Sequence, residues 1–250
     1  MNTFFRRRKT WITSAHQGFV KGEMHSNTLA AYALAAQKGA DMIETDARMT
    51  SDGVIIVNHD PIVRGFDENG EIKEYVISET DSETITKLHL VKNGGEHDRV
   101  PTLEQTLDFA YKNGMCVNID LKEGIKNAAR VAELVINSGM RGRVVYATNA
   151  SGAEAINLIL SIDPEARFID TPLNFTREKL QSVRDYPSKC YAYTGDFSEE
   201  NISRIRKSGC MLAAISLNES NIKAAFAFHP DMAEYPHTSD FEEIEKLLDL

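Results

Sequence analysis

Short runs rich in β-branched and apolar residues alternate with longer segments of helical periodicity along nearly the whole chain, and this alternation restricts the fold more than any other feature. The runs expected to be strands are residues 10–16, 41–48, 53–60, 115–122, 143–148, 167–171, 189–195, 210–217 and 232–238. The segments expected to be helices include residues 27–39, 102–114, 127–139 and 198–209, several of which end in a basic residue or asparagine close to a glycine. A succession of this kind predicts a parallel sheet.

The number of repeats indicates a closed barrel. If residues 53–60 continue the strand 41–48 like a hairpin across the turn at 51–53, about eight β/α units remain, which fits a TIM (β/α)8 barrel. An open doubly wound sheet is the alternative, but no G-x-G-x-x-G sequence follows the first expected strand. We expect a single barrel domain over residues 1–250, with a polar, turn-rich insertion at about 61–100 after the second strand region.

Composition favours a cytoplasmic enzyme that acts on a small substrate. A net charge of -9 and a pI near 5.3 argue against binding to nucleic acid, whose phosphate backbone is usually met by basic patches. The three cysteines, Cys116, Cys190 and Cys210, lack metal-type spacing and are expected to be buried thiols. We find no apolar window of signal or membrane-span length and expect no stable membrane insertion. The sequence leaves the oligomeric state open.

Polar side chains gather at the ends of the expected strands in the first half of the chain. They are His16, Glu44, Asp46, His59, Asp120 and Lys122. Residues two apart on a strand share one face, as do Glu44 with Asp46 and Asp120 with Lys122. In a β/α barrel the C-terminal ends of the strands converge at one mouth, where active sites form. We therefore expect these six side chains to face the same opening.

The residue types at this mouth suit metal-assisted chemistry on a phosphate. The three carboxylates supply the oxygen ligands that Mg²⁺ or Ca²⁺ prefers. The two histidines suit acid and base work near neutral pH, and Lys122 suits a phosphate oxygen. Each residue alone also has a structural explanation, such as a hydrogen-bonded histidine or a solvated carboxylate. Burying carboxylates beside Met42 and Ile43 is costly without a shared cation, which favours the functional interpretation of the set.

Several short motifs occur in order through the same region. They are His16-Gln17-Gly18, Ser26-Asn27-Thr28, Glu44-Thr45-Asp46, Thr50 to Gly53, His59-Asp60, the helix VPTLEQTLDFA and the strand VNIDLK. This set resembles the signature of the glycerophosphodiester phosphodiesterase family. The resemblance is strong over residues 12 to 125 and weak beyond them, where only the β/α alternation continues.

The resemblance implies a metal-dependent phosphodiesterase on a TIM barrel that splits glycerophosphodiesters into glycerol 3-phosphate and an alcohol, in lipid and glycerol metabolism. By the resemblance, Glu44, Asp46 and Asp120 would bind the divalent cation. His16 and His59 would share general acid and base duties, and Lys122 would help to hold the phosphate. In this family the substrate's own glycerol hydroxyl is a candidate first nucleophile that gives a cyclic phosphate, and the sequence does not distinguish it from water.

Three positions depart from the family pattern. Gln17 replaces the arginine of H-R-G, which would grip a phosphate with two charged hydrogen bonds, so we expect Gln17 to be a weaker substrate contact. Ser26 replaces a glutamate and is a candidate helix N-cap, and Asp120 is one methylene shorter than the usual glutamate. In the last expected strand, His237 is a further candidate substrate contact that would restore part of the missing positive charge, with Glu234 beside it.

These departures keep other functions open. One is a related phosphodiesterase that acts on a lysophospholipid or a cyclic product. Another is a homologue that binds phosphodiesters without turnover, and a third is an unrelated barrel enzyme. The presence of both histidines and Lys122 argues against binding alone, which needs no acid and base.

Overall fold

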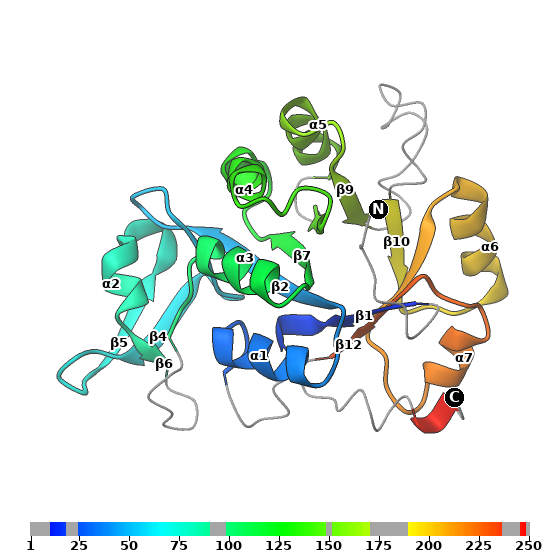
Figure 1. Cartoon of the computed structure of the whole chain (residues 1–250), viewed down its shortest axis with the longest axis horizontal. Coiled ribbons are helices and arrows are strands. Elements are labelled where there is room, and N and C mark those ends of the chain that lie inside the picture. Colours follow the sequence, from blue (N-terminus) through cyan, green and yellow to red (C-terminus); the bar gives the residue numbers. More distant parts are fainter. Residues whose placement is uncertain are drawn as a thin grey trace.

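The computed structural model of the chain describes residues 11–18, 25–90, 99–148, 152–170, 190–236 and 246–248. Eight parallel strands form a closed barrel, because β1 pairs with both β2 and β12 (Figure 1). The strands are β1 (Ile12–Ala15), β2 (Met42–Met49), β7 (Cys116–Leu121), β8 (Val144–Ala147), β9 (Arg167–Asp170), β10 (Cys190–Thr194), β11 (Met211–Ala214) and β12 (Met232–Tyr235). The predicted TIM barrel is confirmed and the open sheet is wrong.

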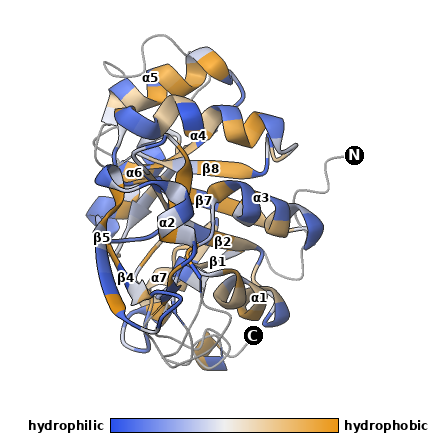
Figure 2. Cartoon of the chain, turned by 90° about the vertical axis from the view of Figure 1, so that its left-hand side faces the viewer, coloured by the Kyte–Doolittle hydropathy of each residue, from blue (hydrophilic) through white to orange (hydrophobic). Residues whose placement is uncertain are grey.

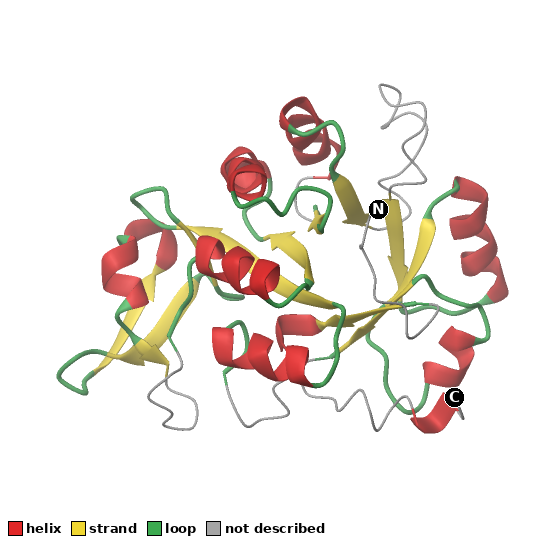
Figure 3. Ribbon diagram, viewed as in Figure 1, coloured by secondary structure: helices red, strands yellow, loops and turns green. Residues whose placement is uncertain are grey.

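Helices follow the strands and pack around the outside of the barrel (Figure 3). They are α1 (Leu29–Gln37), α3 (Leu103–Lys112), α4 (Ile125–Asn137), α5 (Gly152–Ile162), α6 (Glu199–Ser208) and α7 (Ile222–Phe226). Short 3-10 turns are η1 (His16–Gly18), η2 (Ile77–Glu79) and η5 (Lys246–Leu248). All four expected helices are confirmed, and every run expected to be a strand contains one.

Local sequence signals set the helix ends. Thr102 and Gln105 form a reciprocal capping box at the start of α3, which satisfies two backbone N–H groups. The N-cap of α1 is Thr28, whose hydroxyl accepts a hydrogen bond from the backbone N–H of Ala31 at 3.2 Å. Ser26, the N-cap candidate from the sequence, lies two residues too early. The helix α6 ends at Gly209, whose left-handed φ of 82° is accessible to glycine at little cost.

The barrel interior changes from apolar to polar along the strands. The apolar floor includes Ile12, Met42, Cys116, Val145, Ile169, Tyr191, Ala213 and Met232. Side chains two residues further along a strand return to the same face. On four strands these next residues are Ser14, Glu44, Asn118 and Glu234. The chain thus closes the bottom of the barrel with apolar side chains and lines its C-terminal mouth with polar ones.

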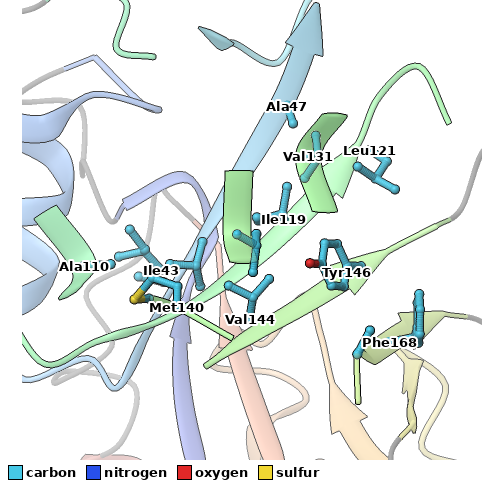
Figure 4. Close-up of a cluster of buried hydrophobic side chains, with 14 of the residues drawn as sticks. Ile43, Ala47, Ala110, Ile119, Leu121, Val131, Met140, Val144, Tyr146 and Phe168 are labelled. Carbon is cyan, nitrogen blue, oxygen red and sulfur yellow. The ribbon is translucent and has the colours of Figure 1, made fainter. Parts of the chain in front are cut away.

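The larger core lies between the barrel and its helices. Outward-facing residues such as Ile43 on β2 and Ile119 on β7 pack against Ala110 of α3 and Val131 of α4 (Figure 4). These side chains alternate with the inward polar ones, so one strand serves both the core and the mouth. Figure 2 contrasts the apolar strand β8 with the largely hydrophilic strand β5 of the insertion. This packing fixes the strands that carry the polar groups.

The insertion at 61–100 has more regular structure than its polar, turn-rich sequence predicts. After β3 (Ile55–Val57) it forms an antiparallel sheet of β4 (Ile62–Phe66), β5 (Ile72–Val76) and β6 (His89–Leu90), with α2 (Ser82–Thr86) alongside (Figure 1). Its small core includes Val63, Ile77 and Ile85 together with Ile56 of β3. The apolar alternation on both sides of the turn at 67–70 was the available hairpin signal. The short strands made that signal easy to miss.

Two expectations from composition can be compared with the structure. Cys116, Cys190 and Cys210 are free and buried, as predicted. Within the described ranges, no helix combines the length and the apolar character needed to cross a lipid bilayer.

Candidate active site

Three predicted carboxylates meet at the C-terminal mouth of the barrel. The parallel register sets Asp46 of β2 beside Asp120 of β7, and Glu44 lies two residues before Asp46 on the same face. One oxygen of each carboxylate lies within 4.8 Å of the others. Two oxygens on opposite sides of one ion are about 4 Å apart for Mg²⁺ and about 5 Å for Ca²⁺. The predicted ligand set is therefore assembled at separations that one cation can bridge.

Lys122 lies among these acids. Its Nζ atom is 2.9 Å from Oδ1 of Asp46 and 2.8 Å from Oδ2 of Asp120. Burial acts to lower the pKa of Lys122, but the charges of Asp46 and Asp120 outweigh it and raise that pKa above its ordinary value. The ammonium is therefore charged at neutral pH. Nζ donates a hydrogen bond to Asp120, and its contact with Asp46 is an ion pair, so N–H groups of the ammonium remain for a ligand.

One ammonium does not neutralise three clustered carboxylates, two of which are buried. Burial raises the pKa of Glu44 well above its ordinary value, and nearby carboxylates, Asp46 most strongly, raise it further. Burial also raises the pKa of Asp120 against the opposing effect of Lys122. Both shifts reflect mainly the cost of charging a carboxylate away from water, with repulsion from neighbouring carboxylates added, and a bound divalent cation would oppose both effects. The all-oxygen donor set fits a hard cation such as Mg²⁺ or Ca²⁺.

The loop after β1 surrounds the Asp46 carboxylate with amides. Nε2 of Gln17 donates to Oδ2 of Asp46 at 2.9 Å, and Nδ2 of Asn27 donates to the same oxygen at 2.6 Å. The backbone N–H of Gln17 donates to Oε2 of Glu44 at 3.0 Å. Gln17 was expected to contact the phosphate, and that role stays a prediction. No site role was predicted for Asn27 from the sequence, although its S-N-T motif was the available signal.

The two histidines reach the mouth by different routes. His16 directly follows β1, and its Nε2 atom lies 3.8 Å from Oε2 of Glu44. His59 follows β3, which runs back antiparallel to β2 and so returns the chain to the level of Asp46. The Nδ1 atom of His59 is 2.8 Å from Oδ1 of Asp60. The side chains of His16 and His59 remain 34% and 54% exposed, which leaves both accessible to a substrate.

A fourth carboxylate, Glu234, lines the mouth from β12, the other neighbour of β1. Oε2 of Glu234 accepts hydrogen bonds from Ser14 at 3.3 Å and from Asn118 at 3.4 Å. Burial raises the pKa of Glu234 to about 7, against these hydrogen bonds. Glu234 was expected at the end of the last strand, but it was not among the predicted site residues. His237, which was among them, lies outside the described residues.

Comparison with known proteins decides the family. A sequence model of the "Glycerophosphoryl diester phosphodiesterase family" matches residues 16–167, more than half of the chain. The chain belongs to this family. The matched range begins at His16 and includes the three clustered carboxylates, so the resemblance seen in the motifs is confirmed.

Individual relatives agree with this membership. The glycerophosphodiester phosphodiesterase of Caldanaerobacter subterraneus subsp. tengcongensis is 34% identical over 131 residues, which are 51% of this chain and 51% of the relative. That of Bacillus altitudinis is 32% identical over 123 residues, which are 48% and 49% of the two chains. The chain therefore spans about half the length of these curated relatives.

Solved structures share the fold. A glycerophosphodiester phosphodiesterase from Agrobacterium tumefaciens has a TM-score of 0.71 at 23% identity, covering 91% of this chain and 96% of that one. An Oleispira antarctica phosphodiesterase in complex with the product sn-glycerol-3-phosphate has a TM-score of 0.74 at 19% identity, covering 96% and 97%. At these identities the likeness establishes the common barrel.

Proposed function

We propose that this family member hydrolyses glycerophosphodiesters to glycerol 3-phosphate and an alcohol with the help of a divalent cation. The observation that carries the proposal is the meeting of three carboxylates and a lysine at one barrel mouth. The curated relatives are named for this activity, and the Oleispira antarctica structure holds sn-glycerol-3-phosphate. The substrate class would place the protein in lipid and glycerol metabolism.

The cation would be held by Glu44, Asp46 and Asp120, with Mg²⁺ and Ca²⁺ as the candidates. A bound divalent cation neutralises charge on phosphate oxygens and makes the phosphorus easier to attack. Lys122 would direct an N–H at a phosphate oxygen from between Asp46 and Asp120. The pKa of Lys122 is raised, which supports a permanently charged contact.

The two histidines would move the protons. Asp60 engages Nδ1 of His59 at 2.8 Å, which leaves Nε2 as the atom that exchanges a proton with the substrate. The Nε2 atom of His16 lies 3.8 Å from Oε2 of Glu44, next to the carboxylate cluster. One histidine accepts the proton of the attacking hydroxyl, from water or from the substrate's glycerol, and the other donates to the leaving alcohol. Both side chains are accessible to a substrate, so either histidine could be the base and the other the acid.

We also infer that the chain forms a single domain and acts in the cytoplasm. The insertion at 61–100 shares Ile56 with the barrel strand pair, which supports a single domain over residues 1–250. Three free cysteines support a reducing compartment and hence the cytoplasm.

A second substrate class is favoured by one observation. The Gln17 amide donates to Asp46, so the phosphate grip that the family's arginine would supply is missing here. A related diester, such as a lysophospholipid or a cyclic phosphate, is therefore the alternative substrate.

The test is the steady-state release of glycerol 3-phosphate from a panel of glycerophosphodiesters that differ in their alcohol. Each substrate is assayed after chelation and again after Mg²⁺ or Ca²⁺ is restored. We expect release that chelation abolishes and added cation restores. Release that persists undiminished in chelator contradicts the role of the cation, and turnover of a lysophospholipid alone supports the second class.

A further inference from the structure

Two positions of the connection between β1 and α1, Gln17 and Asn27, are joined next to Asp46. The carbonyl oxygen of Gln17 accepts a hydrogen bond from the backbone N–H of Asn27 at 2.9 Å. This bond brings both carboxamide side chains to the same carboxylate oxygen. Oδ2 of Asp46 accepts from Gln17 at 2.9 Å and from Asn27 at 2.6 Å. The amide pair therefore holds one side of a carboxylate that is 0% exposed.

The two amides leave a defined part of Asp46 for other partners. A carboxylate oxygen offers about two lone pairs, so two donors fill Oδ2. The other oxygen, Oδ1, lies 2.9 Å from Nζ of Lys122. Asp46 also donates its backbone N–H to Oδ1 of Asn27 at 3.3 Å. Rotation of the Asp46 carboxylate would break these amide hydrogen bonds. The loop that carries the two amides therefore sets the orientation of the carboxylate.

The backbone conformation at position 17 does not favour glutamine. Gln17 has φ 51° and ψ 17°, in the left-handed region where residues other than glycine are uncommon. A glycine adopts this conformation more easily. The side chain of Gln17 is 5% exposed and its amide is directed at Asp46. The hydrogen bond, and not the turn, accounts for a glutamine here.

We propose that Gln17 is a positioning residue for the cation site. It orients Asp46 through Oδ2 so that Oδ1 is the oxygen available to a divalent cation. Its amide is neutral, so it does this without adding positive charge beside the cation, as an arginine would. The inference rests on the proposed function, in which Glu44, Asp46 and Asp120 bind that cation.

The test compares Gln17→Gly with the parent protein, using Mn²⁺ alone as the probe and electron paramagnetic resonance to measure free Mn²⁺. Removing a partner that orients a metal ligand typically weakens metal binding by about 10- to 100-fold. We expect a loss of that size in Gln17→Gly, with thermal stability unchanged or higher because the left-handed backbone suits glycine. A residue needed only for folding would lower stability and affinity together.

Two further variants complete the design. His229→Gly is the matched control, because His229 is exposed, has φ 50° and precedes β12 at the opposite end of the barrel. It should keep parental Mn²⁺ affinity. Gln17→Met keeps most of the side-chain volume without the amide and should lose affinity as Gln17→Gly does.

The outcomes separate this inference from the function on which it rests. Parental Mn²⁺ affinity in both Gln17 variants, with a raised KM for a glycerophosphodiester, overturns the inference and makes Gln17 a substrate contact. A parent protein that binds no Mn²⁺ overturns the cation in the proposed function and this inference with it. Weaker Mn²⁺ binding in both variants, with parental binding in His229→Gly, supports the inference.

Discussion

The ammonium of Lys122 lies 2.9 Å from Oδ1 of Asp46, a buried acid of the candidate cation site. The same ammonium is 2.8 Å from Oδ2 of Asp120. A single lysine is thus held by two strands at the point where substrate phosphate would meet the cation. These acids keep Lys122 protonated. Its positive charge should favour the binding of phosphate but oppose the binding of a cation.

Replacing Lys122 by alanine should lower kcat/KM for a glycerophosphodiester by about 10²- to 10³-fold, the usual cost of one lost electrostatic contact to a transition state. Cation affinity should be unchanged or higher, because a positive charge leaves the site. Steady-state kinetics and Mn²⁺ titration measure the two effects. Lys112→Ala is the control, since Lys112 pairs with Asp108 on the exposed face of α3. Equal losses in both variants would contradict a role for Lys122.

Replacing His16 or His59 by alanine should lower kcat by about 10²- to 10⁴-fold, the range for a lost general acid or base. Mn²⁺ affinity should stay near the parental value, because neither ring belongs to the carboxylate cluster. His229→Ala, on an exposed residue at the far end of the barrel, should be neutral. A variant with parental kcat removes that histidine from the mechanism, and a matching loss of Mn²⁺ affinity identifies it as a ligand.

The stability of the cation-free protein should fall as the pH rises from 5 to 8. Glu234 has a pKa of about 7 in the fold against an ordinary value of 4.5, because burial disfavours its charge. The pKa of Glu44 is raised for the same reason. Such groups contribute stability that is complete below the unfolded pKa and is lost as pH rises through the folded pKa. Thermal melting in chelator across this range measures the loss.

The control for this pH effect is Glu234→Gln, which removes one titrating group and should flatten the decline. Added Mg²⁺ should reverse the decline at pH 8, because bound cation favours the charged carboxylates. Asp52, Asp67 and Asp81 have lowered pKa values and act only at more acidic pH. A melting temperature in chelator that is constant or rises from pH 5 to 8 would contradict the account.

Gln17→Arg should raise kcat/KM for glycerophosphodiesters at saturating Mg²⁺, because a guanidinium restores a charged, bidentate phosphate contact. At limiting Mg²⁺ the advantage should shrink or reverse, because the added charge beside Asp46 opposes the cation. The measurement is kcat/KM as a function of Mg²⁺ concentration. An unchanged or lower value at saturation with glycerophosphodiesters, but not with a lysophospholipid, would favour the second substrate class.

The barrel and the carboxylate cluster were predictable because both follow from short-range patterns in the sequence, namely the alternation of side chains along each strand and the succession of strands and helices. Alternation along β2 sends Ile43 to the outer core and Glu44 to the mouth, and parallel strands bring Asp46 beside Asp120. These relations need only the strand assignments and the rule that strand ends converge.

Other features depended on contacts that local patterns do not encode. The Gln17 amide meets Asp46 because Gln17 takes a left-handed backbone conformation and its loop bonds to Asn27. No propensity favours that conformation for glutamine. The insertion strands are short and stabilised by a core shared with Ile56, so their polar sequence resembled a loop.

The most direct test of the central claim compares the parent protein with Asp46→Asn in a glycerol 3-phosphate release assay, with and without chelator. The isosteric side chain of Asp46→Asn can still accept both amide hydrogen bonds through its oxygen, but its NH2 group then replaces Oδ1 beside Lys122 and removes the cation ligand. We predict chelator-sensitive release in the parent, with no such release and no tight Mn²⁺ binding in a folded Asp46→Asn. Parental release and Mn²⁺ affinity in Asp46→Asn would contradict the assigned site.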